Sequence, residues 1–147
     1  MEKVLLSKLP HFVRNVLAVI WLEEPKKTAT ILALRGDLGA GKTTFTQALA
    51  QVLGVTDTLQ SPTYVLMKKY KTTNEKFHTL VHIDAYRLES AEQFAALKPE
   101  QFLSDPRALV VIEWPERVEA ALPKPDLTVK FSSEGAAEGE RYVSIEK

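Results

Sequence analysis

The sequence predicts a three-layer α/β domain built around a mixed sheet. Short apolar runs typical of buried strands alternate with amphipathic helical segments, and two strand-like runs are joined only by a short polar turn. The 147 residues suit one domain, and 45% hydrophobic with 26% charged residues is the composition of an ordinary globular chain. We therefore expect a single domain over residues 1–147, with a parallel core and antiparallel additions.

The N-terminal part of the chain begins the alternation of helices and strands. Apolar residues recur at helical spacing over residues 12–22, which predicts an amphipathic helix. Residues 29–35 form a short apolar run that predicts a buried strand, and this run leads directly into a glycine-rich turn. A second helical pattern follows the turn and is expected to end at Gly54.

The rest of the chain adds the remaining strands. Residues 64–71 and 76–88 predict two strands of a hairpin, because a polar turn separates them. Ser90 is expected to cap the next helix, with Gln93 in the capping-box position. The later elements are expected to be a helix at 90–97, a buried strand at 108–114, a short helix opened by Pro115, and closing strands at 126–131 and 141–147.

Composition and charge exclude several classes of function. The formal net charge is zero, so no global basic field attracts nucleic acid, and any contact with RNA is expected to be local or to pass through a partner. The absence of cysteine excludes disulfides, thiol nucleophiles and cysteine metal sites. Lys8 and Pro10 interrupt the first apolar run, and Arg14 interrupts the next one. We expect a cytoplasmic protein with no membrane attachment.

A glycine-rich run, GDLGAGKTT at residues 36–44, fits the phosphate-loop pattern G-x-x-x-x-G-K-[ST] in full and has the required strand before it and helix after it. Lys42 is expected to reach the β- and γ-phosphates, and the Thr43 hydroxyl is expected to bind Mg²⁺. Thr44 either adds a hydroxyl near the α/β-phosphates or is a solvated first-turn residue. The loop predicts a P-loop NTPase fold. The nucleotide-binding residues expected from it are Asp37, Leu38, Gly39, Ala40, Gly41, Lys42, Thr43 and Thr44.

The expected cofactors are ATP and Mg²⁺. The chain contains neither N-K-x-D, which reads guanine, nor D-x-x-G, which reads the γ-phosphate in GTPases, so GTP is disfavoured. A metal in such a site needs an acid at the carboxyl end of a neighbouring strand. Glu113 ends an apolar strand and resembles a Walker B element with Glu in place of Asp. Asp84 ends another strand and shares a face with His82.

These acidic and polar candidates each have a plainer interpretation. Glu113 could be a strand-end charge facing water, and Asp84 could be a helix or turn cap. His82 is expected to make a structural hydrogen bond, because nothing in the sequence supplies it with metal partners. Thr63, in the string SPTY, is either a switch residue that senses the γ-phosphate or Mg²⁺, or part of a turn that starts a strand.

Four strings occur together in a characteristic order: GDLGAGKTT, SPTY, HIDAYRL and IEWPERV. In this combination, from about Leu9 to the final strands, the chain resembles the bacterial tRNA threonylcarbamoyladenosine-biosynthesis ATPases, the TsaE family. The resemblance implies a small ATPase with a mixed sheet. It also implies TsaD-like and TsaB-like partners, which install a threonylcarbamoyl group on adenosine 37 of tRNAs that read codons beginning with A.

The resemblance also assigns roles to residues. Thr43 and Glu113 match the family's Mg²⁺ positions, and Asp84 matches a residue needed for activity. The adenine side is expected near the segment from Leu9 to Phe12. Together with the switch interpretation, the catalytic candidates are Asp84, Glu113 and Thr63.

Two other functions use the same loop. One is a small-molecule kinase with Asp84 as the base on an acceptor hydroxyl. The other is a binding module that ATP switches without hydrolysis. The arginines are scattered and form no cluster, so isolated hydrolysis is expected to be slow and stimulated by partners, with Arg87 as a candidate cation in cis. Trp114 adjoins Glu113 and is either a reporter of nucleotide or a plain packing residue.

Overall fold

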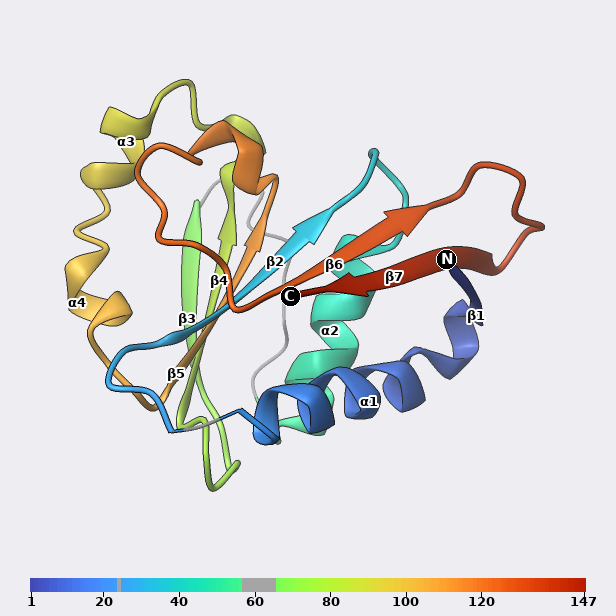
Figure 1. The fold of residues 1–147 in the computed structure, drawn as a ribbon, viewed down its shortest axis with the longest axis horizontal. Coiled ribbons are helices and arrows are strands. Elements are labelled where there is room, and N and C mark those ends of the chain that lie inside the picture. Colours follow the sequence, from blue (N-terminus) through green and yellow to red (C-terminus); the bar gives the residue numbers. More distant parts are fainter. Residues whose placement is uncertain (24, 57–65) are drawn as a thin grey trace.

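One mixed sheet organises the molecule (Figure 1). The computed structural model describes residues 1–23, 25–56 and 66–147. Within these ranges seven strands are ordered β1-β7-β6-β2-β5-β4-β3 across the sheet. They are β1 (Glu2–Leu5), β2 (Thr30–Arg35), β3 (Met67–Lys71), β4 (Thr79–Asp84), β5 (Ala108–Glu113), β6 (Leu127–Ser132) and β7 (Glu140–Glu146).

The centre of the sheet is parallel and its edges are antiparallel. Strands β6, β2, β5 and β4 run in one direction, whereas β3 pairs antiparallel with β4, β7 with β6, and β1 with β7. The predicted parallel core with antiparallel additions is therefore confirmed. The carboxyl ends of β2, β5 and β4 meet at one edge, where Leu34 and Asp84 both lie opposite Glu113.

Helices cover the two faces of the parallel half (Figure 1). On one face Leu32 and Phe45 belong to a core that includes α1 and α2, and on the other Ile31 and Phe94 belong to a core that includes α3 and α4. This is the predicted three-layer arrangement. The helices are α1 (Leu9–Trp21), α2 (Lys42–Val52), α3 (Ala91–Ala95), α4 (Glu100–Leu103) and the 3₁₀ turns η1 (Leu6–Lys8), η2 (Ala85–Arg87) and η3 (Pro115–Arg117).

The strands buried on both faces match their predictions most closely. All six residues of β5 are buried, as expected for a parallel strand between two layers of helices. Helix α1 starts at Leu9 instead of residue 12, because Pro10 lies in its first turn, where proline is tolerated. Within the described ranges, no helix is long and apolar enough to cross a bilayer.

The hairpin strands are shorter than the sequence pattern suggests. The Asn74 carboxamide oxygen accepts the backbone N–H groups of Lys76 and Phe77, each at 2.9 Å, and this closes the turn between β3 and β4. Strand β4 ends at Asp84, and the 3₁₀ turn η2 takes the place of residues 85–87 of the expected strand. Residues 64 and 65 of the expected first strand lie outside the described residues.

Candidate functional site

The glycine-rich loop between β2 and α2 is held tightly against the sheet. Gly36 has φ +149°, and a Cβ placed there would lie 2.7 Å from the carbonyl oxygen of Phe131 in β6. No residue with a side chain fits this position without moving the backbone. Gly41 has φ +111° and occupies the N-cap position of α2. Both glycines of the motif are therefore explained by the path of the loop.

The first turn of α2 is open to an anion. Among the described residues no side chain caps this helix, whereas the Ser90 hydroxyl accepts the N–H of Gln93 at the start of α3. The first N–H groups of a helix have no partner within the helix, and together with the helix dipole they form a phosphate site. A cleft of about 260 Å³ opens here, and Lys42, Thr43 and Thr44 line it.

Lys42 lies under this cleft with its ammonium group largely enclosed. Its Nζ donates hydrogen bonds to the carbonyl oxygens of Gly36 and, at 3.2 Å, Asp37, and it lies 3.9 Å from the ring centroid of Trp114. Burial lowers the pKa of Lys42, and the nearby carboxylate of Glu113 opposes that shift. An enclosed cation at the base of a phosphate loop is suited to bind phosphate oxygens.

A chain of hydrogen bonds crosses from the loop to the neighbouring strands. Thr43 Oγ1 donates to Glu113 Oε1 at 3.3 Å, and the other carboxylate oxygen, Oε2, lies 2.5 Å from His82 Nε2. His82 is fully buried and Glu113 is 4% exposed. Glu113 is therefore not a strand-end charge facing water, and His82 makes the structural hydrogen bond expected of it. The second ring nitrogen of His82, Nδ1, has no partner among the described residues.

Thr43 and Glu113 present oxygen atoms that could hold a metal ion at a bound nucleotide. No group of three or more His, Asp or Glu side chains in the described ranges could hold a metal by itself. Mg²⁺ at a nucleotide is typically bound by one or two protein oxygens, with phosphate oxygens and water completing the octahedron. A hydroxyl and a carboxylate 3.3 Å apart beside the phosphate loop match that donor set.

Asp84 lies beside Glu113 in the register of two adjacent parallel strands. Its Oδ1 accepts the backbone N–H of Tyr86 at 3.0 Å and so caps the 3₁₀ turn η2, while the side chain also lines the cleft. Burial raises the pKa of Asp84, the Tyr86 N–H opposes this, and the Glu113 carboxylate raises it further. The cap interpretation is thus correct, and it is compatible with a role in the cleft.

Two aromatic rings form a wall of the cleft. The rings of Tyr86 and Trp114 lie 5.0 Å apart, and both side chains line the cavity. Trp114 adopts a left-handed backbone with φ 59°, and its backbone N–H donates to the Leu34 carbonyl oxygen at 3.3 Å. This conformation directs the indole ring toward Lys42. Sequence reasoning identified Trp114 but not Tyr86, although Tyr86 stands two residues after Asp84.

The remaining candidates are placed less centrally. Leu9 lines a second cavity of about 590 Å³, which shares Leu6 and Thr44 with the cleft. Phe12 lies in the core, with its ring 6.0 Å from that of Phe45, and it lines neither of these cavities. Arg87 is exposed and does not line the cleft. Thr63 and the rest of SPTY lie outside the described residues.

Comparison with known proteins identifies the family. The model of the family described as "Threonylcarbamoyl adenosine biosynthesis protein TsaE" matches residues 14–143. The chain belongs to the TsaE family. The matched range contains the phosphate loop and both strand-end acids, but it excludes Leu9 and Phe12.

Curated TsaE proteins show the same relationship. A tRNA threonylcarbamoyladenosine biosynthesis protein TsaE of Bacillus subtilis (strain 168) is 37% identical over 114 residues, which are 78% of this chain and 68% of the relative. The protein of the same name from Synechocystis is 41% identical over 92 residues, covering 60% of this chain and 56% of that one. A crystal structure of Bacillus subtilis YdiB superposes with a TM-score of 0.70 at 26% identity, covering 97% of this chain and 80% of that chain.

Proposed function

We propose that this TsaE-family chain is an Mg²⁺-dependent ATPase that acts in the cytoplasm with TsaD-like and TsaB-like partners in threonylcarbamoylation of tRNA adenosine 37. Family membership and the names of the relatives support the tRNA-modification part. The observation that supports ATP binding is the arrangement of Lys42, Thr43 and Glu113 at the uncapped start of α2. Contact with tRNA is proposed to be indirect, because the net charge of the chain is zero.

The phosphates would be bound by the first N–H groups of α2 and by the ammonium group of Lys42. Thr43 Oγ1 and the Glu113 carboxylate would hold Mg²⁺. When bound, Mg²⁺ neutralises charge that develops on the phosphate oxygens during transfer. His82 fixes the orientation of Glu113 through Oε2, so that Oε1 faces Thr43.

Glu113 and Asp84, the two strand-end acids, are proposed to have different roles. Both oxygens of Glu113 have hydrogen-bonding partners, which suits a fixed ligand. Among the described residues, one hydrogen bond reaches the Asp84 carboxylate: the backbone N–H of Tyr86 donates to Oδ1. The other carboxylate oxygen, Oδ2, is therefore available to orient the attacking water. Asp84 is therefore proposed as the residue that positions water, and Glu113 as the metal ligand.

Substitution of Lys42 tests ATP binding. Lys42→Ala removes a charge-assisted contact worth about 1.5–3 kcal/mol, so affinity for ATP should fall by about tenfold or more, and turnover should fall with it. Lys71→Ala is the matched control, since Lys71 is exposed and pairs with Thr79 at the end of β4 far from Asp84. Calorimetric titration of both variants with MgATP decides the point. Equal affinity and turnover in both variants would show that this loop is not the site.

Product analysis with and without the partners tests the reaction. The isolated chain is expected to release phosphate slowly and to release it faster once TsaD-like and TsaB-like proteins are added. Label from the γ-phosphate of ATP should appear in inorganic phosphate. Label on a small-molecule acceptor would favour a kinase. ATP-dependent association with the partners but no hydrolysis would favour a switched binding module.

A further inference from the structure

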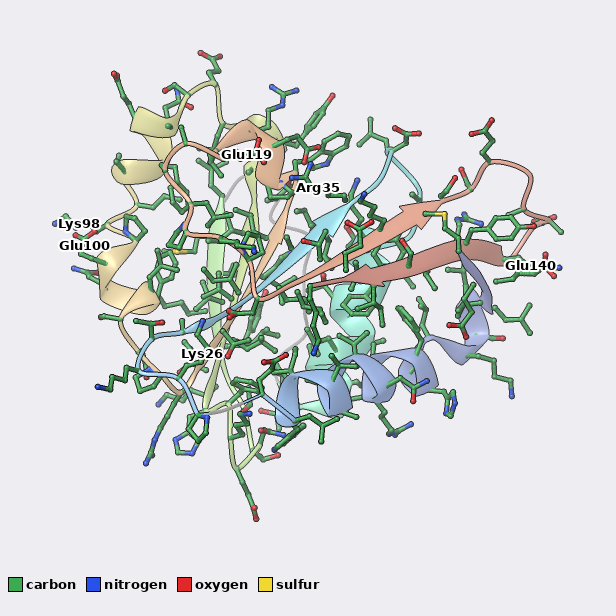
Figure 2. All side chains as sticks on the ribbon, viewed as in Figure 1. Lys26, Arg35, Lys98, Glu100, Glu119 and Glu140 are labelled. Atoms are coloured by element: carbon green, nitrogen blue, oxygen red, sulfur yellow. The ribbon has the colours of Figure 1, made fainter. Side chains whose placement is uncertain are left out.

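Arg141 in β7 reaches the phosphate loop from a distant part of the chain. Its Nη2 donates to the carbonyl oxygen of Gly39 at 3.2 Å, and its Nη1 donates to the Glu140 carbonyl at 2.6 Å. The side chain lines the same cleft as Lys42 and Thr43. Glu140 is the first residue of β7 and lies at the end of that strand (Figure 2). The hydrogen bond to Gly39 shows that the adjacent Arg141 reaches from this strand to the loop.

Within the described part of the chain, the positive charge of Arg141 has no opposing carboxylate. No carboxylate among the described residues lies within ion-pair distance of it, and its Nε is buried without a partner. Glu140, its neighbour in sequence, is instead 3.9 Å from Lys3. Partial burial of a guanidinium without an opposing charge costs free energy, and an anionic ligand in the cleft would offset that cost.

The other arginines are engaged elsewhere or face solvent. Arg35 at the end of β2 is 3.4 Å from both Glu116 and Glu119, and Figure 2 shows it beside Glu119. Arg117 stacks on the outer ring of the aromatic wall, 5.1 Å from Tyr86. Of the arginines, only Arg141 lines the cleft.

The position of Arg141 indicates which phosphates it meets. A Cβ built on Gly41 would lie 3.6 Å from Leu6 and 3.8 Å from Arg141, so these two side chains flank the loop on one side. Leu6 also lines the second cavity, whereas Glu113 and Asp84 line the cleft and not that cavity. We propose, on the basis of the proposed ATP-binding function, that Arg141 binds the nucleotide at its α- and β-phosphates, between the metal site and the nucleoside. Arg141 then contributes to affinity and not to the transfer step.

Neutral and conservative variants of Arg141 test this assignment. Arg141→Gln should weaken MgATP and MgADP binding alike, by about tenfold each, because both nucleotides carry the α- and β-phosphates. The turnover number at saturating ATP should stay within about twofold. Arg141→Lys should lose less affinity, since it keeps the charge but not the guanidinium fork. Arg107→Gln, which removes the same charge near His78 at the opposite edge of the sheet, should bind as wild type.

Calorimetry measures the affinity for both nucleotides, steady-state phosphate release measures the turnover number, and thermal melts check that each variant is folded. A turnover loss of about a hundredfold with unchanged affinity would place Arg141 at the γ-phosphate and overturn the proposal. Unchanged affinity for both nucleotides would show that Arg141 only hydrogen-bonds the Gly39 carbonyl oxygen, and this result would also overturn the proposal. If Arg141→Gln does not fold, the affinities of Arg141→Lys for MgATP and MgADP test the proposal instead. Affinities equal to those of the wild type would overturn it. Failure of wild-type protein to bind ATP would instead refute the proposed function.

Discussion

Replacing Gly36 by alanine should disrupt the anchoring of the phosphate loop to the sheet. The added Cβ would lie 2.7 Å from the Phe131 carbonyl oxygen, 3.2 Å from the Phe131 Cβ and 3.3 Å from the Ala40 Cβ. The nearest obstacle is the backbone of Phe131 near the carboxyl end of β6, which cannot rotate away as a side chain can. The residue would also keep a positive φ of +149°, which an L side chain rarely adopts.

The magnitude follows from two separate contributions. A left-handed backbone costs a residue with a side chain roughly 1–2 kcal/mol. Overpacking against rigid neighbours adds typically about 1–3 kcal/mol. The expected loss for Gly36→Ala is therefore about 2–5 kcal/mol. At about 2–4 °C per kcal/mol for a chain of this size, the melting temperature should fall by roughly 4–20 °C.

Gly135→Ala separates the two contributions. Gly135 has a positive φ of +73°, but a Cβ there would meet nothing within 4 Å. It should therefore lose only the backbone contribution, about 1–2 kcal/mol. Urea unfolding of both variants gives the difference. Equal stabilities would refute the close approach between the loop and β6. Gly36→Ala should also weaken ATP binding, because the Gly36 carbonyl accepts a hydrogen bond from Lys42.

Three further predictions concern the cleft. Glu113→Gln should make ATP binding less dependent on Mg²⁺, whereas Asp84→Asn should bind MgATP nearly normally and hydrolyse it poorly; wild-type turnover in both variants would contradict the division of roles. Burial raises the pKa of Asp84, so the ionised carboxylate is destabilised in the folded state. Asp84→Asn should therefore raise the free energy of unfolding at neutral pH. This gain should disappear as the pH falls below the ordinary aspartate pKa, because the carboxyl group is then protonated in both the folded and the unfolded state. Thermal melts from pH 3 to 8 check this, and a variant less stable at neutral pH would contradict it. In a Trp21→Phe background, Trp114 fluorescence should respond to ATP, because Lys42 lies 3.9 Å from the indole, and the response should be lost in Lys42→Ala.

The elements that sequence reasoning located correctly depend on local patterns. Strand β5 was predictable because both of its faces are buried, which produces an uninterrupted apolar run. The loop was predictable because its glycines and Lys42 occupy fixed positions between a strand and a helix. Glu113 and Asp84 were expected at strand ends, and the structure places them opposite each other, because carboxyl ends of parallel strands meet at one edge.

The elements that were missed depend on pairing between distant segments. Strand β1 has a single buried residue, Val4, so no alternation identifies it, and it exists through its pairing with β7. Helix α4 is four residues long and contributes Phe102 to the core, which is too short for a helical period to show. The expectation that Phe12 lies near the adenine stays a prediction, and the sequence did not indicate that its ring on the apolar face of α1 packs against that of Phe45.

The same reasoning explains why the environment of the loop could not be derived from its motif. Three segments far from the loop in sequence press against it: β6 through Phe131 at Gly36 and Gly41, η1 through Leu6 at Gly41, and β7 through Arg141 at Gly39. These contacts arise from the strand order β1-β7-β6-β2, which places β6 beside the strand that precedes the loop and the two terminal strands, β7 and β1, beyond β6. The motif indicates a phosphate site, and contacts from these distant segments hold the loop in place. Substitutions in β6 and β7 should therefore change nucleotide affinity although no residue of the loop is altered.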